Sequence, residues 1–265
     1  MTKIDGLLRL GEMELPVPPF GALDGRELDH LRTHQRLSDS AKFGIRAFVQ
    51  ADMEKGHPPL YALRFDCKTE AREPRPPITL LNVGLQGVQG KPVVTASGAA
   101  VPPECLRQLE PGRQFMLRNG PNRSCPSDEV MAAAEVCLTR YLDLFPAARD
   151  CDLIVQRMVF GIAEGVSGNG ICCNYPESHG AERHFRGIYL PNQQGIQLRQ
   201  GAWGTPQHAL SELDRIHAQS YRALKEAHAS ASVRFGPNPY FEFTIEAGEL
   251  YFLQYQERKR LVADD

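Results

Sequence analysis

The chain has 265 residues, of which 42% are hydrophobic and 23% charged, with a formal net charge of −2 and a pI near 6.5. This composition excludes a low-complexity disordered chain and an overall basic field that would hold a nucleic acid backbone. No apolar run approaches the about 18 residues of a transmembrane helix, and the N-terminal stretch carries charges where a signal peptide is apolar. We therefore expect a globular, cytoplasmic protein without a nucleic acid or membrane partner.

The seven cysteines form an odd set with no CxxC pair. In a chain of this size the pattern favours reduced thiols over a disulfide framework. Cys172 and Cys173 are adjacent, so on a strand their side chains would point to opposite faces and would not bind one ion together. We expect both to pack in the interior, as free cysteines usually do.

Pro and Gly clusters divide the chain into two predicted lobes. Residues 1–120 form the first, which opens with a short amphipathic helix and a Pro-rich turn at residues 16–19. Residues 101–127 are dense in Pro, Gly, Asn and Ser. We interpret them as the crossing between the lobes or as a large loop over a cleft. Residues 121–265 form the second lobe.

The second lobe opens with a predicted helix. Ser127 is a suitable N-cap, Asp128 and Glu129 suit the positive end of the helix dipole, and Pro146 ends the run. Apolar residues recur at helical spacing, so one face should be buried; it consists of Val130, Ala134, Leu138, Tyr141 and Phe145.

Strands are predicted after this helix, within residues 152–160, near 171–173 and near 184–190, with a flexible GVSGNG turn at 165–170. A second helix is expected to begin at Thr205-Pro206. Its apolar face would contain Leu210, Leu213, Ile216 and Leu224.

The chain closes with a predicted β-hairpin. FEFTIE and ELYFLQY alternate in hydropathy and are joined at Ala247-Gly248. The order of elements is that of an α+β fold with a sheet-rich second lobe.

Motifs of several enzyme classes are absent from the sequence. It contains no GxxxxGK[ST] phosphate loop, no GxGxxG, no HExxH and no GxSxG. Of the eight histidines, His179 and His184 lie near one another, at a spacing that does not place both rings on one side of a strand. Any nucleotide chemistry must therefore come from carboxylates, amides and basic side chains on strands.

Four stretches resemble, in order, segments of one family. KIDGLLRLGEMELPVPP resembles an opening Lys, an amphipathic helix and a Leu-Pro-Val-Pro-Pro turn, and LYALRFDCKTEAREPRPPITLLNVGLQ resembles a Val-x-Val-Arg-Ser-Gly strand followed by Leu-Asn-x-Gly-Leu. LIVQRMVFGIAEGVSGNGICC is similar to a Val-Gln-x-Met-Val strand with a Ser-Gly-x-Gly turn, and FEFTIEAGELYFLQYQERKR to a closing Glu-Phe-Thr…Leu-Gln-Thr-Arg hairpin. Together they resemble the nucleotide-binding domain of pyruvate phosphate dikinase and phosphoenolpyruvate synthase.

This resemblance implies an ATP-grasp-like, two-lobed α+β fold with mixed or antiparallel sheets around a central cleft. It also implies ATP and Mg²⁺ as cofactors and phosphoryl transfer as the chemistry. Lys3 and Arg64 match phosphate-binding positions, and Gln156 lies on the strand that lines the adenine pocket. A gapless alignment would place Asp66 at the position of Arg64; we favour Arg64, because a guanidinium binds phosphates and a carboxylate repels them. Without the resemblance, Lys3 is a solvated terminal lysine and Gln156 a core or edge amide.

Glu242 and Gln254 match the metal-binding positions of the closing hairpin. Mg²⁺ prefers oxygen ligands and is commonly coordinated by one or two protein groups together with phosphate oxygens. A two-residue turn at Ala247-Gly248 would pair Glu242 with Leu253 and would turn Gln254 to the opposite face. We therefore predict a three-residue connection, Ala247-Gly248-Glu249, which pairs Glu242 directly with Gln254.

The sequence departs from the family at several positions. Gln254-Tyr255-Gln256 replaces the closing Gln-Thr-Arg, Tyr240 replaces an acidic residue, and no Ser-Gly follows Arg64. Losing a charged partner of a transition state typically slows a reaction on the order of a hundredfold. The alternative to a phosphotransferase is thus a catalytically inactive, ATP-grasp-like pseudoenzyme that binds a nucleotide or a partner. A carboxylate-activating ligase is a third hypothesis.

None of the histidines stands in the family's phosphohistidine context. The phosphoryl acceptor is therefore expected on another protein chain or on a small molecule.

Overall fold

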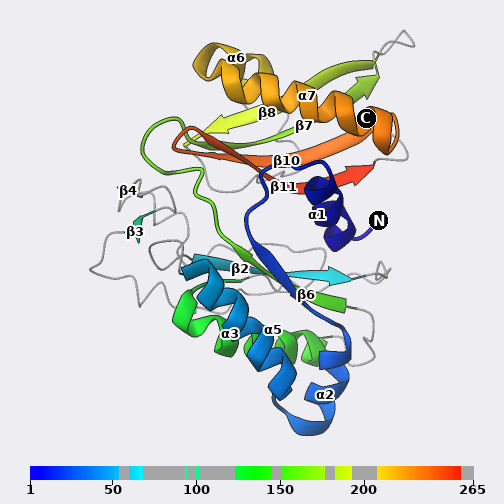
Figure 1. The fold of residues 1–265 in the computed structure, drawn as a ribbon, viewed down its shortest axis with the longest axis vertical. Coiled ribbons are helices and arrows are strands. Elements are labelled where there is room, and N and C mark those ends of the chain that lie inside the picture. Colours follow the sequence, from blue (N-terminus) through cyan, green and yellow to red (C-terminus); the bar gives the residue numbers. More distant parts are fainter. Residues whose placement is uncertain are drawn as a thin grey trace.

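The computed structural model of the chain shows two larger antiparallel sheets, each covered by helices on one face (Figure 1). The predicted α+β class is confirmed. None of the described helices is long and apolar enough to span a bilayer. The residues that the structure describes are 1–53, 60–67, 93–94, 100–101, 123–144, 151–176, 183–192 and 208–257.

The first sheet has the strand order β1-β6-β2-β5 and is antiparallel throughout. Its strands are β1 (Phe20–Leu23), β2 (Leu60–Cys67), β5 (Arg123–Pro126) and β6 (Cys151–Arg157). The helices packed against it are α2 (Arg26–His34), α3 (Asp39–Met53) and α5 (Val130–Leu144).

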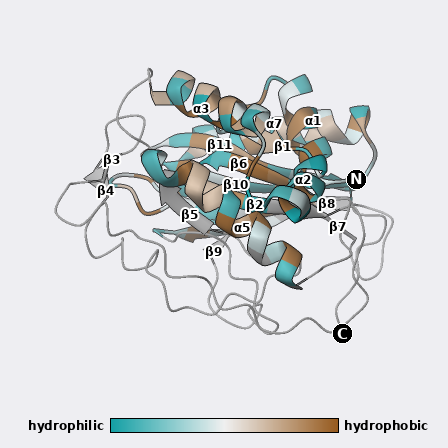
Figure 2. Cartoon of the chain, turned by 90° about the horizontal axis from the view of Figure 1, so that it is seen from below, coloured by the Kyte–Doolittle hydropathy of each residue, from teal (hydrophilic) through white to brown (hydrophobic). Residues whose placement is uncertain are grey.

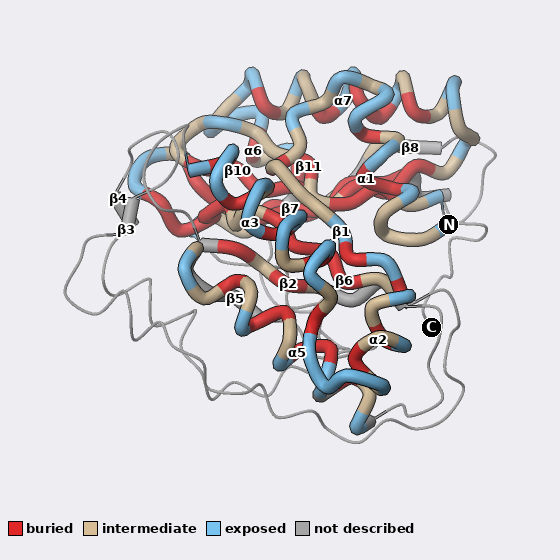
Figure 3. Tube along the Cα trace, turned by 60° about the horizontal axis from the view of Figure 1, so that its bottom comes forward, coloured by how far each residue is buried: buried red, intermediate tan, exposed pale blue. Residues whose placement is uncertain are grey.

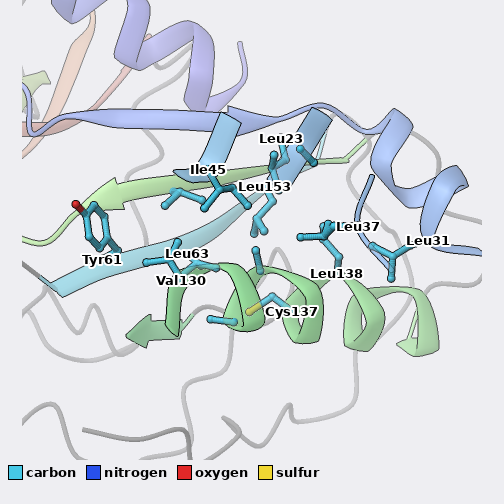
Figure 4. Packing of buried hydrophobic residues seen from close by; sticks show 14 of the residues in the cluster. Leu23, Leu31, Leu37, Ile45, Tyr61, Leu63, Val130, Cys137, Leu138 and Leu153 are labelled. Carbon is cyan, nitrogen blue, oxygen red and sulfur yellow. The ribbon is translucent and has the colours of Figure 1, made fainter. Parts of the chain in front are cut away.

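Alternating side chains of the first sheet form its core with these helices. Leu63 of β2 and Leu153 of β6 point toward α3 and α5, where they meet Ile45, Val130 and Leu138 (Figure 4). The intervening residues of the same strands lie on the opposite face, because successive strand residues alternate.

The predicted helix after Ser127 is confirmed. A 3-10 turn, Ser127–Glu129, leads into α5, and Val130, Ala134, Leu138 and Tyr141 are buried as expected. Phe145 lies outside the described residues.

The second sheet has the order β11-β10-β7-β8-β9. Its strands are β7 (Gly168–Pro176), β8 (Arg183–Pro191), β9 (His208–Ala209), β10 (Pro239–Glu246) and β11 (Glu249–Glu257). The helices α6 (Leu210–Ile216) and α7 (Ala218–Arg234) cover one face, and α1 (Lys3–Glu12) packs on the edge strand β11. A separate two-stranded ladder joins β3 (Val93–Val94) to β4 (Ala100–Val101).

The prediction of a flexible turn at residues 165–170 is partly wrong. Gly168, Asn169 and Gly170 belong to β7 and are buried. A Cβ at Gly170 would lie 2.1 Å from Cζ of Phe243, so the glycine permits a close approach of that ring to the strand. Cys172 and Cys173 pack in two different apolar clusters, which confirms that they point to opposite faces.

The second predicted helix begins at Leu210, after strand β9, and is interrupted at His217. Leu210, Leu213 and Leu224 are buried as expected, whereas Ile216 is exposed. Thr205-Pro206, the predicted start, lies outside the described residues, as do most of the crossing segment 101–127 and the side chains of His179 and His184.

The residues of the two sheets are not separated by a single boundary at residue 120. Residues 123–157 lie with the first sheet, because β6 pairs with both β1 and β2. Helix α1 lies with the second sheet, although residues 20–23 belong to the first. Strands are buried and the outer faces of the helices are exposed in both halves (Figure 3).

Candidate functional site

Strand β10 separates its side chains between two faces. Phe241, Phe243 and Ile245 enter the core beneath α7. Tyr240, Glu242, Thr244 and Glu246 alternate with them and face away from that core. Glu242 is half-buried, whereas the other residues of β10 are buried. Solvent therefore reaches this strand at Glu242.

Glu242 pairs directly with Gln254 across the hairpin. Cross-strand partners share a face, so both oxygen-bearing side chains lie on the same side of the second sheet. The pairing that the sequence analysis predicted is thus confirmed.

The prediction that a three-residue connection produces this pairing is wrong. Glu246 pairs with Glu249, so the turn has two residues, Ala247 and Gly248, both with positive φ (50° and 91°) as a two-residue hairpin turn requires. The register instead shifts between Glu242 and Phe243. Leu253 is the extra residue on β11, a β-bulge that turns Gln254 to the face of Glu242.

Arg64 reaches this hairpin from the first sheet. It pairs with Ile154 on the face of β2 opposite the helix-covered core. Its Nη2 donates a hydrogen bond to the carbonyl oxygen of Leu253 at 3.3 Å. The guanidinium therefore lies beside the peptide that joins Leu253 to Gln254. The structure thus places Arg64 beside the residue that precedes Gln254, which is the cross-strand partner of Glu242. The side chain of Asp66, the alternative to Arg64, lies outside the described residues.

Gln156 lies on the same face of the first sheet as Arg64, two residues along β6 from Ile154. It is buried, and its Nε2 donates to the carbonyl oxygen of Pro18 at 3.4 Å. In this structure Gln156 therefore ties β6 to the segment before β1.

Lys3 is the first residue of α1 and is half-buried. Residues 3, 6, 7 and 10 recur at helical spacing, and Gly6 packs so closely on β11 that a Cβ would lie 2.2 Å from the carbonyl oxygen of Tyr255. Lys3 thus begins the helix face that contacts β11, one turn before Gly6.

A second carboxylate on the polar face of β10, Glu246, escaped the sequence analysis. Its Oε1 accepts a hydrogen bond at 2.7 Å from the N–H of Phe160, in the segment that joins β6 to β7. Burial raises the pKa of Glu246 to about 7, although the Phe160 N–H and the charge of Arg157 act in the opposite direction. The signal was present in the sequence, because Tyr240, Glu242, Thr244 and Glu246 occupy every second position.

Arg157 also anchors the first sheet to α3. Its Nε donates to Oδ2 of Asp52 at 2.8 Å, and the hydroxyl of Tyr61 donates to the same oxygen at 2.9 Å. Asp52 and Tyr61 are buried. The other oxygen of Asp52, Oδ1, forms an ion pair with Nη2 of Arg157, so this buried carboxylate is structural.

The donor set fits a magnesium–phosphate complex better than a closed metal site. Among the described residues, no three His, Cys, Asp or Glu side chains cluster as a metal site would require. Glu242 and Gln254 present carboxylate and amide oxygens on one face, and the hydroxyl of Tyr240 lies 3.4 Å from Glu242 Oε1. Mg²⁺ commonly takes one or two protein ligands and completes its shell with water and phosphate oxygens.

The chain is similar in sequence to part of a dikinase. Pyruvate, phosphate dikinase from Clostridium symbiosum is 30% identical over 145 residues, which cover 51% of this chain and 16% of that protein. No protein-family model matches the chain. The chain spans about a sixth of the dikinase, so the activity of that protein is not carried over by the match.

Solved structures of a D-alanyl-alanine synthetase and of D-alanine–D-alanine ligases are similar over most of the chain. D-alanyl-alanine synthetase A from Vibrio cholerae matches 96% of this chain and 54% of its own, with 9% identity and a TM-score of 0.44. D-alanine–D-alanine ligases from Helicobacter pylori and, complexed with ATP, from Bacillus anthracis match 97% and 96% of this chain and 50% and 55% of theirs, each with 10% identity and a TM-score of 0.36.

These structural matches are too distant to carry an argument about function. The described architecture itself, two antiparallel sheets that each carry helices on one face, agrees with the ATP-grasp-like fold implied by the resemblance.

Proposed function

We propose that the chain binds the triphosphate of ATP, with Mg²⁺, between the polar face of the β10–β11 hairpin and strand β2, and that it acts in phosphoryl transfer. Glu242 and Gln254 would hold the metal, and Arg64 would hold phosphate oxygens. Bound Mg²⁺ would neutralise charge on the phosphates. Lys3 and Gln156 are proposed to contact the nucleotide from α1 and β6.

The observation that carries this proposal is the bulge at Leu253. It pairs Glu242 with Gln254 and leaves the Leu253 carbonyl in contact with Arg64. Bulges commonly re-aim side chains next to functional sites. A neutral carbonyl is a weaker acceptor for a guanidinium than a phosphate oxygen, so a bound triphosphate would replace it. The sequence match to the dikinase supports the same chemistry.

Gln256 favours the alternative, an inactive protein that binds nucleotide without turnover. It pairs with Tyr240 two residues beyond Gln254, on the face of the site, where the resembled family has an arginine. A neutral amide cannot supply the charge of that arginine to a transition state. The phosphoryl acceptor of an active protein would be another chain or a small molecule.

Thermal unfolding with millimolar ATP, with and without Mg²⁺, tests nucleotide binding. A ligand present at 100 times its dissociation constant adds about 2.7 kcal/mol to the free energy of unfolding. Glu242→Ala should abolish the additional effect of Mg²⁺ and weaken ATP binding about tenfold, or roughly 1.4 kcal/mol. Arg64→Ala should weaken ATP binding both with and without the metal.

Glu249→Ala is the matched control, because Glu249 is an exposed carboxylate on the same hairpin. It should leave both effects unchanged. No stabilisation by ATP would contradict both nucleotide-binding hypotheses, and a full Mg²⁺ effect in Glu242→Ala would contradict the metal assignment. Release of phosphate or formation of AMP then distinguishes a phosphotransferase from an inactive binding protein.

A further inference from the structure

The outer face of helix α3 carries a large exposed aromatic side chain. Phe43 is 74% exposed, and Met53 at the end of the same helix is 41% exposed. Seen from the side of α2, α3 and α5, apolar residues on these helices stand beside polar ones (Figure 2). A single exposed apolar residue is ordinary and marks no interface, so the neighbours of Phe43 are decisive.

Asp39, Phe43 and Arg46 form one stripe on α3, which we call the α3 stripe. They follow the spacing i, i+4 and i+7, so they lie on one face of the helix, and Asp39 and Arg46 are exposed. No ion pair within the described residues uses either charge. An acid, an aromatic ring and a base thus stand in sequence along the outer side of α3.

The α3 stripe is complementary to itself. If a second α3 lies antiparallel across the first, with a two-fold axis near residues 42 and 43, Asp39 of each copy faces Arg46 of the other. The two Phe43 rings then lie close to the axis. Such a self-complementary patch is what a two-fold symmetric interface requires, and the opposite charges at its two ends fix the antiparallel register.

The surface beside the stripe has room for the ring of the other copy. A cavity of about 560 Å³ opens next to Arg46, between α3 and the start of α5, and includes Ile45, Val49 and Met131. Helical side chains lean toward the N-terminus of their own helix. The ring of an antiparallel copy therefore leans toward the C-terminal half of this α3, where the cavity lies.

We propose that the chain associates with a second copy of itself through the α3 stripe, with Phe43 as the central anchor. A specific interface buries about 800 Å² per partner, which exceeds one stripe. Met53, which lines the cavity next to Arg46, adds exposed apolar area beside the stripe. The interface lies on the helix side of the first sheet, opposite the face that carries Arg64.

Sedimentation equilibrium of the full chain, over about 1 to 100 µM, tests the proposal within the range where weak association is detected. The wild-type chain should show a monomer–dimer equilibrium. Phe43→Asp should raise the dimer dissociation constant by at least about tenfold, as the loss of a central aromatic anchor does. Because Phe43 is exposed, this variant should unfold at the temperature of the wild-type monomer.

Charge reversal gives the decisive comparison. Asp39→Arg and Arg46→Asp alone should each weaken the dimer, because each places like charges together twice by symmetry. The double variant Asp39→Arg/Arg46→Asp should restore dimerisation. Val233→Asp, at an 88%-exposed apolar position on α7, is the matched control and should have no effect.

Three results would overturn the proposal: a wild-type chain that stays monomeric over the whole range, a dimer that Phe43→Asp leaves intact, or a double variant that associates no better than the single ones. In the first case the α3 stripe would not be a surface for self-association. In the other two, the dimer would use another surface.

Discussion

Glu246 is a carboxylate whose buried environment differs strongly from that of a free side chain. It is buried at the end of β10, with the Phe160 N–H as a hydrogen-bond donor. The charged or titratable groups near it are Arg157 of β6 and Tyr251 of β11, with Glu249 as its cross-strand partner. Its carboxyl group holds the linker after β6 against the hairpin, so its protonation state should affect stability.

The raised pKa of Glu246 predicts the sign of this effect. Its folded-state pKa of about 7 lies above the ordinary value of 4.5, so the stabilisation from the bound proton is present below pH 4.5 and is lost as pH rises through 7. Glu246→Gln keeps an oxygen for the Phe160 N–H but cannot ionise. Between pH 5 and pH 8, the free energy of unfolding of this variant should rise by on the order of 2 kcal/mol relative to that of the wild type.

Urea unfolding at several pH values measures this difference. Glu257→Gln is the control, since Glu257 is exposed at the opposite end of the same hairpin, and it should not change the slope of stability with pH. Parallel pH profiles for Glu246→Gln and wild type would show that Glu246 does not titrate as its burial predicts.

The strand β11 shows how one extra residue changes an element. Phe252 and Tyr255 are three residues apart, yet both enter the core beneath α7. Strict alternation would place them on opposite faces. The extra residue of the bulge, Leu253, returns Tyr255 to the face of Phe252. The odd spacing of two aromatic residues in ELYFLQY is therefore the sequence signal for the bulge, which an account based on turn length alone missed.

The contact between α1 and β11 gives a prediction with a matched pair of glycines. A Cβ at Gly6 would lie 2.2 Å from the Tyr255 carbonyl oxygen, whereas a Cβ at Gly11 would have no neighbour within 4 Å. Gly6→Ala should lower the free energy of unfolding by about 1–3 kcal/mol, because α1 must move away from the strand.

Gly11→Ala, on the same helix, should instead be neutral or stabilise the protein by up to about 1 kcal/mol through helix propensity. Denaturant unfolding compares the two variants. Equal effects would show that the close approach of α1 to β11 is absent in solution.

At the scale of the whole molecule, the chain crosses between the sheets instead of completing one before the other. Helix α1 contacts the second sheet, β1 belongs to the first, and the segment after β6 is hydrogen-bonded to the hairpin through Val166 and Ser167. Neither sheet can unfold without exposing residues that the other covers, so the two should unfold together.

Differential scanning calorimetry tests this cooperativity. We expect one transition with equal calorimetric and van't Hoff enthalpies, and Gly6→Ala should shift the whole transition. Two separate transitions, or a shift confined to one of them, would mean that the sheets are independent folding units.

The sequence by itself determined the elements with strong local signals. The apolar spacing of α5 and the alternation in the closing hairpin each depend on neighbours within a few residues. The candidate residues Glu242 and Gln254 were also found from sequence, through the resemblance of the hairpin. Their pairing was predicted correctly, but from a three-residue connection that the structure does not have. The pairing comes from the bulge at Leu253, which lets Phe252 and Tyr255 both pack against residues distant in the chain.

Only the tertiary structure decided which elements share a sheet and which side chains meet. The pairing of β6 with β1 and β2, the close approach of Gly170 to Phe243 and the contact of Arg64 with Leu253 all join residues far apart in the chain. Local propensity carries no information about such partners, because their stability comes from burial and hydrogen bonds that exist only once the chain has folded.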